Sequence, residues 1–150
     1  MNSKNIERRW NQIGYLGRHL IIELFDCNSE KINNEKFLEK ILVESLIEAG
    51  SKVLGKFFYK FQPQGVTGII AIAESHLSLH TWPEKNYAAL DIFTCGVKID
   101  PWKVYRRIVE EIKPKKVKIL ELSRGPLTRP KILEEVLAKW RLVVYGIQKH

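Results

Sequence analysis

Long hydrophobic runs are missing from this chain of 150 residues. No apolar stretch reaches the roughly 18 residues that a membrane-spanning helix requires, and the polar residues 1–11 lack the apolar core of a secretory signal. Only two cysteines and one methionine are present, so at most one disulfide can form, and we expect a reducing, cytoplasmic compartment. Disordered chains, membrane proteins and disulfide scaffolds are thereby excluded, and we expect a single domain over residues 1–150.

Acidic residues become scarce toward the end of the chain. Residues 1–96 carry equal numbers of basic and acidic side chains, so the whole net charge of +8 lies in residues 97–150. A basic segment of this kind can attract nucleic acid or a phosphorylated partner. Aromatic residues do not interleave with the basic ones here, as they do in single-strand binders. We interpret the charge as a solvated helix face and a basic tail, and expect neither nucleic acid nor membrane as a partner.

Hydrophobic periodicity and turn signals predict the order of the elements. Strands are expected over residues 17–25, 53–61, 66–73, 76–82, 87–95 and 117–122. Helices are expected from Asn33 or Asn34 to Gly50, from Asp100 to Pro114 and over 130–140. Short connections between neighbouring strands imply antiparallel pairing, and two amphipathic helices can cover one face of the sheet. The predicted fold class is α+β: a two-layer sandwich of an antiparallel sheet with helices packed on one face.

The densest group of reactive side chains lies in residues 74–95. Side chains alternate in direction along a strand, which places His76, Ser78, His80 and Trp82 on one face. If a hairpin turns through residues 83–86, Cys95 comes close to the start of the first strand. The sequence therefore predicts hydroxyl, imidazole, thiol and carboxylate groups close together on one face of the sheet.

Spacing alone leaves several interpretations of this group of side chains open. His76, His80 and Cys95 could ligate zinc, although no second Cys/His pair stands at ligand spacing. Cys95 and His80 could form a thiol nucleophile and its base. The third interpretation is a buried, inert cysteine beside two structural histidines. We expect no metal.

A longer motif carries a family resemblance. The stretch Glu74-Ser-His-Leu-Ser-Leu-His-Thr-Trp-Pro-Glu84, followed by Tyr87-Ala-Ala-Leu-Asp-Ile-Phe-Thr-Cys-Gly96, resembles the prokaryotic S-adenosylmethionine decarboxylase proenzymes, which are pyruvoyl-dependent decarboxylases. Gly17-Arg-His-Leu20 and Pro63-Gln-Gly-Val-Thr-Gly68 also look like the family. The resemblance spans about residues 15–126. The segment from about 127 to 150 looks like an extension without a family role.

The resemblance implies that the chain cuts itself between Glu74 and Ser75, giving a β chain of residues 1–74 and an α chain of 75–150. Ser75 would attack the Glu74 carbonyl, and elimination of the resulting ester would leave a pyruvoyl cofactor derived from Ser75. The family assigns the base to the histidine that His80 matches, and an imidazole titrates in the right range for that step. Cys95 matches the family's proton donor, and a thiol is mostly protonated at neutral pH.

The resemblance also implies the substrate and the assembly. S-adenosylmethionine would be decarboxylated to the aminopropyl donor for spermidine, with Phe61, Trp82 and Glu84 as substrate-binding residues. Phe61 would stack on adenine, and Glu84 would bind the ribose hydroxyls. Relatives form homodimers of αβ protomers. Two alternatives stay open: a pyruvoyl-dependent arginine decarboxylase of the same family, and a non-catalytic basic nucleic-acid-binding domain.

Overall fold

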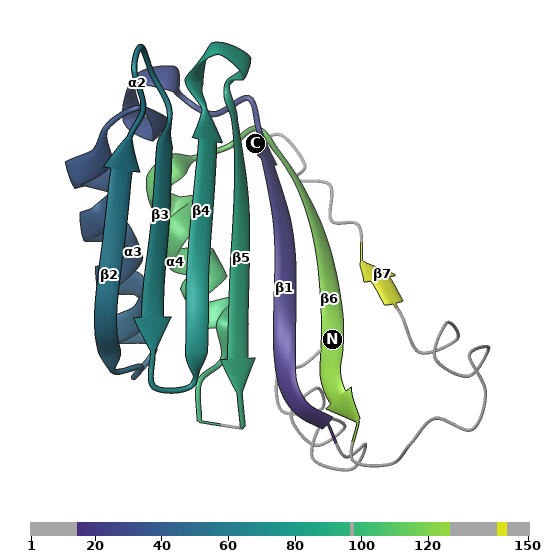
Figure 1. The fold of residues 1–150 in the computed structure, drawn as a ribbon. Coiled ribbons are helices and arrows are strands. Elements are labelled where there is room, and N and C mark those ends of the chain that lie inside the picture. Colours follow the sequence, from purple (N-terminus) through teal and green to yellow (C-terminus); the bar gives the residue numbers. More distant parts are fainter. Residues whose placement is uncertain (1–14, 97, 127–140, 144–150) are drawn as a thin grey trace.

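The computed structural model describes residues 15–96, 98–126 and 141–143. Its strands are β1 (Tyr15–Phe25), β2 (Val53–Lys60), β3 (Val66–Ile72), β4 (Ser75–Trp82), β5 (Tyr87–Cys95), β6 (Lys116–Pro126) and β7 (Arg141–Val143). Its helices are α2 (Ser29–Ile32), α3 (Glu35–Glu48), α4 (Pro101–Ile112) and the 3₁₀ helix η1 (Pro83–Lys85). The strands form one antiparallel sheet in the order β2-β3-β4-β5-β1-β6-β7. Because α3 and α4 lie behind one face of this sheet (Figure 1), the predicted two-layer α+β sandwich is confirmed.

The helix boundaries follow from the capping residues that the sequence displays. The side chain of Asn34 accepts a hydrogen bond from Phe37 N and starts α3. Asp100 caps α4 in the same way, with proline at the first helical position, where a missing N–H costs nothing. Lys113 adopts a left-handed conformation and ends α4. No helix within the described ranges combines the length and apolar character needed to cross a membrane.

Other boundaries differ from the prediction. The helix α2 was not predicted because its four residues are too few to show a periodic pattern. Strand β6 continues to Pro126, beyond the predicted end at residue 122. The helix predicted over 130–140 lies outside the described residues. Strand β7, which was not predicted, pairs with residues 119–121 of β6.

The two faces of the sheet differ in chemistry. The face toward α3 and α4 is apolar and buried, with Leu77 and Leu79 of β4 and Leu90 and Ile92 of β5 all fully buried. The opposite face, which we call the open face, carries the histidines and other polar side chains and is covered by no described helix (Figure 1). The predicted alternation along residues 76–82 and 87–95 is therefore confirmed. The face that carries the reactive side chains is turned away from the helices.

The strand order interleaves the two halves of the chain. Strands β1, β2 and β3 precede residue 74, and the strands from β4 onward follow it. In the sheet, however, β1 lies between β5 and β6 and pairs with both along most of its length (Figure 1). A break between β3 and β4 would thus separate the chain into two fragments that share one sheet.

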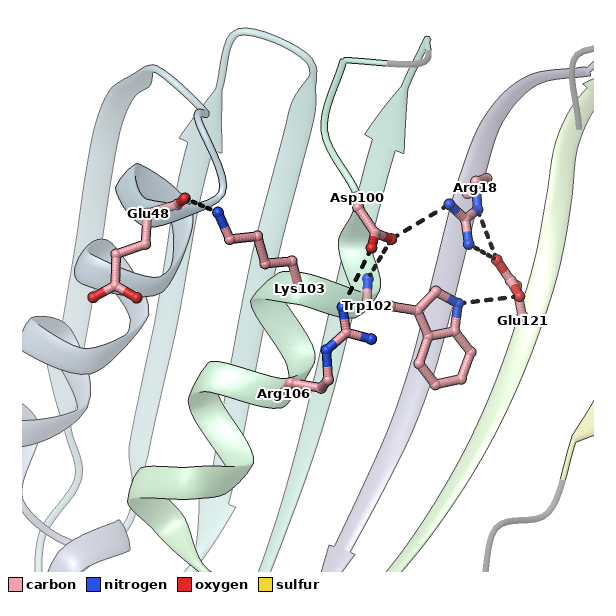
Figure 2. A network of polar contacts seen from close by, with 7 residues as sticks. All are labelled: Arg18, Glu48, Asp100, Trp102, Lys103, Arg106 and Glu121. Atoms are coloured by element: carbon pink, nitrogen blue, oxygen red, sulfur yellow. Dashed lines mark hydrogen bonds and ion pairs between the residues drawn. The ribbon is translucent and has the colours of Figure 1, made fainter. Parts of the chain in front are cut away.

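A polar network fastens the start of α4 to strands β1 and β6 (Figure 2). Arg18 contacts one carboxylate oxygen of Glu121 through Nε at 2.8 Å and Nη2 at 2.7 Å. Arg18 also lies 3.5 Å from Asp100, and Trp102 Nε1 donates to the other oxygen of Glu121 at 3.3 Å. The Arg18 and Glu121 side chains are each only 12% exposed, so this pair is shielded from water.

Replacing Arg18 with methionine is expected to lower the free energy of unfolding by about 2–3 kcal/mol, because Glu121 keeps its shielded charge and loses its main partner. Urea unfolding checks this. Arg106, which lies 3.5 Å from Asp100 with a 59% exposed side chain, provides the matched control. Arg106→Met should change the free energy by less than about 0.5 kcal/mol, and equal losses for the two variants would contradict the argument.

Candidate active site

The short connection between β3 and β4 holds the peptide bond that the sequence singles out. The backbone N–H of Cys95 donates a hydrogen bond of 2.9 Å to the carbonyl oxygen of Glu74. Ser75 follows with a positive φ of 158°, at the edge of the range that residues with side chains rarely adopt. Its Oγ lies 3.2 Å from His76 Nδ1, and the Glu74 carboxylate accepts a 2.9 Å hydrogen bond from Ser51 Oγ. The Glu74 carbonyl is thus polarised and lies next to a hydroxyl.

The register of β4 against β5 confirms the predicted approach of Cys95 to Ser75 and His76. Ser75 pairs with Thr94, and His76 pairs with Phe93. Cys95 is exposed and is not in a disulfide. We call Glu74, Ser75, His76 and Cys95 the cleavage group; it lies at the end of the sheet where β4 begins and β5 ends.

Within one chain, the structure does not bring His80 together with Ser75 and Cys95. It stands five residues after Ser75 on the same strand, which at about 3.3 Å per residue is a separation of about 16 Å. In register His80 pairs with Ala89 of β5 and Thr67 of β3, and Thr67 Oγ1 lies 2.9 Å from its Nδ1. A Cys95–His80 nucleophile and base pair is excluded in one protomer for the same reason.

The predicted substrate-binding residues accompany His80. Trp82 ends β4, with its ring centroid 6.4 Å from that of His80 and 5.3 Å from that of Tyr87. Phe61 follows β2 and packs edge-on against Tyr59 at 4.9 Å. Glu84 lies in η1 and accepts a 3.3 Å hydrogen bond from Gln64. We call Phe61, Thr67, His80, Trp82 and Glu84 the imidazole group; it lies toward the opposite end of the sheet from the cleavage group.

A further cluster on the open face lies beside the cleavage group. His19 Nε2 lies 3.1 Å from Asp91 Oδ1, and Ser78 donates to Oδ2 at 3.3 Å. Arg124 Nη1 approaches His19 Nδ1 at 3.2 Å, so Nδ1 accepts and Nε2–H donates. The hydrogen bond from His19 is the main cause that lowers the pKa of Asp91. Sequence reasoning missed His19, because its strand is far from the motif and only the pairing of β1 with β5 brings the two together.

The described residues contain no cluster of metal ligands, and the second cysteine is buried. Among the described residues no three His, Cys, Asp or Glu side chains form a group that could hold a metal ion, so the zinc interpretation has no support there. Cys27 is buried and free, as predicted. Burial raises the pKa of its thiol to about 11, which makes Cys27 a packing residue.

Comparison with known proteins agrees with this layout. The sequence model of S-adenosylmethionine decarboxylase matches residues 18–125. The S-adenosylmethionine decarboxylase proenzyme of Caldicellulosiruptor saccharolyticus is 49% identical over 115 residues, which are 77% of this chain and 93% of the relative. The proenzyme of the same name from Acetivibrio thermocellus is 47% identical over the same shares of the two chains.

A solved structure agrees as well. The adenosylmethionine decarboxylase of Aquifex aeolicus superposes with a TM-score of 0.72 at 29% identity, covering 79% of this chain and 98% of that one. The family match includes both the cleavage group and the imidazole group and ends before residues 127–150. The chain therefore belongs to the S-adenosylmethionine decarboxylase family.

Proposed function

We propose that this protein is a self-processing, pyruvoyl-dependent S-adenosylmethionine decarboxylase that cuts itself between Glu74 and Ser75. The observation that carries the proposal is the hydrogen bond from Cys95 N–H to the Glu74 carbonyl oxygen, beside the Ser75 hydroxyl. A backbone N–H aimed at a carbonyl oxygen stabilises the negative charge that develops when the carbon is attacked. The products are a β chain of residues 1–74 and an α chain of residues 75–150.

The cut proceeds by a rearrangement of the chain itself. Ser75 Oγ bonds to the Glu74 carbonyl carbon, the carbon–nitrogen bond breaks, and the hydroxyl proton passes to the Ser75 nitrogen. A base then removes the Ser75 α-proton, and the Cβ–Oγ bond breaks to release the Glu74 carboxylate. Water replaces the nitrogen on the remaining unsaturated residue and ammonia leaves, which generates the pyruvoyl group at the new N-terminus.

The residues of the cleavage group fit that cofactor. When present, the pyruvoyl ketone provides an electron sink for loss of the substrate carboxylate. The exposed Cys95 thiol lies at the same end of the sheet as residue 75 and returns a proton to the substrate α-carbon. A thiol with this task must stay reduced, and both cysteines are free, which supports a cytoplasmic location.

The separation of the two groups supports a homodimer of αβ protomers. His80 lies about 16 Å along the strand from Ser75 and cannot remove the Ser75 α-proton of its own chain. A two-fold contact between open faces, with the strand directions reversed, brings each cleavage group to the imidazole group of the partner. The partner's His80 then provides the base, held through its Nδ1 by Thr67 as it is here.

The open face has the character of such a contact. Phe57, Ile69 and Trp82 are 60%, 46% and 38% exposed, and the register places Phe57 and Ile69 side by side in the row that continues to Ser78. Exposed apolar side chains gathered on one face mark an interaction surface. Two sheets packed through such faces form a four-layer assembly with the helices outside.

The aromatic side chains of the imidazole group favour S-adenosylmethionine over arginine. Phe61 is 47% exposed and can stack on an adenine ring, and the Trp82 ring can attract the sulfonium cation. Glu84 is the carboxylate of this group, already hydrogen-bonded to Gln64, and suits ribose hydroxyls. A guanidinium substrate would call for additional carboxylates there.

Intact mass and carboxyl-labelled substrates test the proposal. We expect two chains, one with the mass of residues 1–74 and the other with that of residues 75–150. Reduction with borohydride should increase the mass of the α chain, and S-adenosylmethionine should release labelled CO₂. Release of labelled CO₂ from arginine but not from S-adenosylmethionine would support the arginine-decarboxylase alternative instead. A single uncut chain without a reducible carbonyl would overturn the proposal.

A further inference from the structure

Thr94 is the residue of β5 that pairs with Ser75 of β4, and its hydroxyl is unusual. The side chain is 0% exposed, and its Oγ1 is the one buried side-chain polar atom in the described part of the chain that lacks a hydrogen-bond partner. A buried hydroxyl without a partner is destabilising, whereas valine would fill the same volume without that penalty. The unprocessed fold therefore does not explain why threonine stands at this position.

Other buried hydroxyls among the described residues have hydrogen-bond partners. Thr81 Oγ1 accepts from Val66 N at 2.9 Å and donates to Val66 O at 3.4 Å. Ser45 Oγ donates to Leu42 O at 2.8 Å within α3. The lack of a hydrogen-bond partner thus distinguishes Thr94, which pairs with Ser75 at the place where the chain is cut.

The ladder geometry places the Thr94 hydroxyl close to the reacting atoms. The hydrogen bond from Cys95 N to Glu74 O joins the residue after Thr94 to the residue before Ser75. In an antiparallel ladder this makes Ser75 and Thr94 a non-hydrogen-bonded pair, whose Cα atoms lie about 4.5 Å apart and whose side chains approach most closely. Thr94 is fixed in this position, since β5 is flanked by β4 and β1 on both sides.

Ser75 can turn its hydroxyl toward Thr94. In the uncut chain Ser75 Oγ lies 3.2 Å from His76 Nδ1. Rotation about the Cα–Cβ bond moves Oγ among staggered positions, so Oγ is not confined to its position beside His76. The ester formed by that attack fixes Oγ between the Glu74 carbon and the Ser75 Cβ.

We propose that Thr94 is a catalytic residue of the self-cleavage, whose hydroxyl donates a hydrogen bond to Ser75 Oγ in the ester. This inference rests on the proposed function. During elimination the Ser75 α-proton goes to the base, its electron pair forms the Cα–Cβ double bond, and the Cβ–Oγ bond breaks with its electrons on Oγ. That oxygen becomes part of the Glu74 carboxylate and gains negative charge, so a donor aimed at it stabilises the transition state.

The test measures cleavage over time in the full-length chain purified without prior processing. Thr94→Val is expected to slow the cut roughly tenfold to a hundredfold and to accumulate the ester. Hydroxylamine, which cleaves esters and spares amides, then splits the accumulated chain at residue 74. Thr94→Ser keeps the hydroxyl and should be cut within about twofold of the wild-type rate.

Stability measurements separate this role from a packing role. Thr94→Val should unfold at the same denaturant concentration as the wild type or a higher one, because it loses only an unpaired hydroxyl. Ser45→Ala is the matched control: it loses a satisfied buried hydroxyl and should be less stable yet cut at the wild-type rate. If Thr94→Val folds poorly, Thr94→Ala, which cannot overpack the site, replaces it in the rate measurement.

Three results would overturn the inference. Wild-type cleavage rates in both Thr94→Val and Thr94→Ala would overturn it while leaving the proposed function intact. Equal slowing in Thr94→Ser and Thr94→Val would assign the effect to packing and not to the hydroxyl. A wild-type chain that is never cut at residues 74 and 75 would overturn both this inference and the proposed function.

Discussion

Replacing Ser75 with alanine is expected to leave one uncut chain and to reduce decarboxylation to the background rate. Without Oγ no ester forms at Glu74, and without the ester no ketone forms at residue 75. The fold should persist, since the side chain contributes one hydrogen bond, to His76, worth about 1 kcal/mol. Intact mass after prolonged incubation checks the first expectation, and labelled CO₂ release checks the second.

Cys95→Ala is the informative contrast to Ser75→Ala. The backbone N–H that binds the Glu74 carbonyl oxygen survives this change, so the chain should still be cut. Loss of the proton donor should lower kcat roughly 10²–10⁴-fold. A split chain from Ser75→Ala would disprove the assigned bond, and an uncut chain from Cys95→Ala would show that the thiol takes part in processing.

Mixing two inactive variants should restore cleavage. Ser75→Ala lacks the nucleophile, and His80→Ala lacks the base that we assign to the partner subunit. In a mixed dimer, the intact Ser75 of one chain meets the intact His80 of the other. Random pairing gives half mixed dimers with one complete site each, so about a quarter of the sites should be cut after co-expression.

The control for this experiment is a chain that carries both substitutions. Co-expressed with the wild type it adds no complete site beyond those that wild-type chains already form, and co-expressed with either single variant it should give no cleavage. Mass spectrometry identifies the fragments, which should come only from chains that carry His80→Ala. Cleavage of His80→Ala expressed alone at the wild-type rate would refute the shared site.

The fold was largely predictable because local signals and tertiary packing agree in this chain. Asn34 and Asp100 begin their helices as caps do, and the alternation in β4 and β5 matches the buried and open faces residue by residue. The turn through η1 gives the register that brings Thr94 opposite Ser75. Within the described residues, α2, which is too short for a periodic pattern, strand β7 and the full length of β6 were not predicted.

The site was predicted in part, for a physical reason. Alternation states which face a side chain occupies, and it correctly grouped His76 with His80. It does not convert position along the strand into distance, so it did not show that His80 lies about 16 Å from Ser75 of the same chain. His19 comes to Asp91 only through the pairing of β1 with β5, and the unpaired hydroxyl of Thr94 is a property of the packed structure.

The interleaved strand order has a consequence for the mature protein. Once residues 74 and 75 are separated, β1 belongs to one polypeptide and both of its neighbours belong to the other. Neither polypeptide can leave without breaking three ladders of the sheet, those of β1 with β5, β1 with β6 and β3 with β4, so the pair should copurify and resist exchange with free fragments. Renaturation after heating then becomes a bimolecular reaction whose yield depends on concentration, whereas the uncut precursor recovers as one molecule.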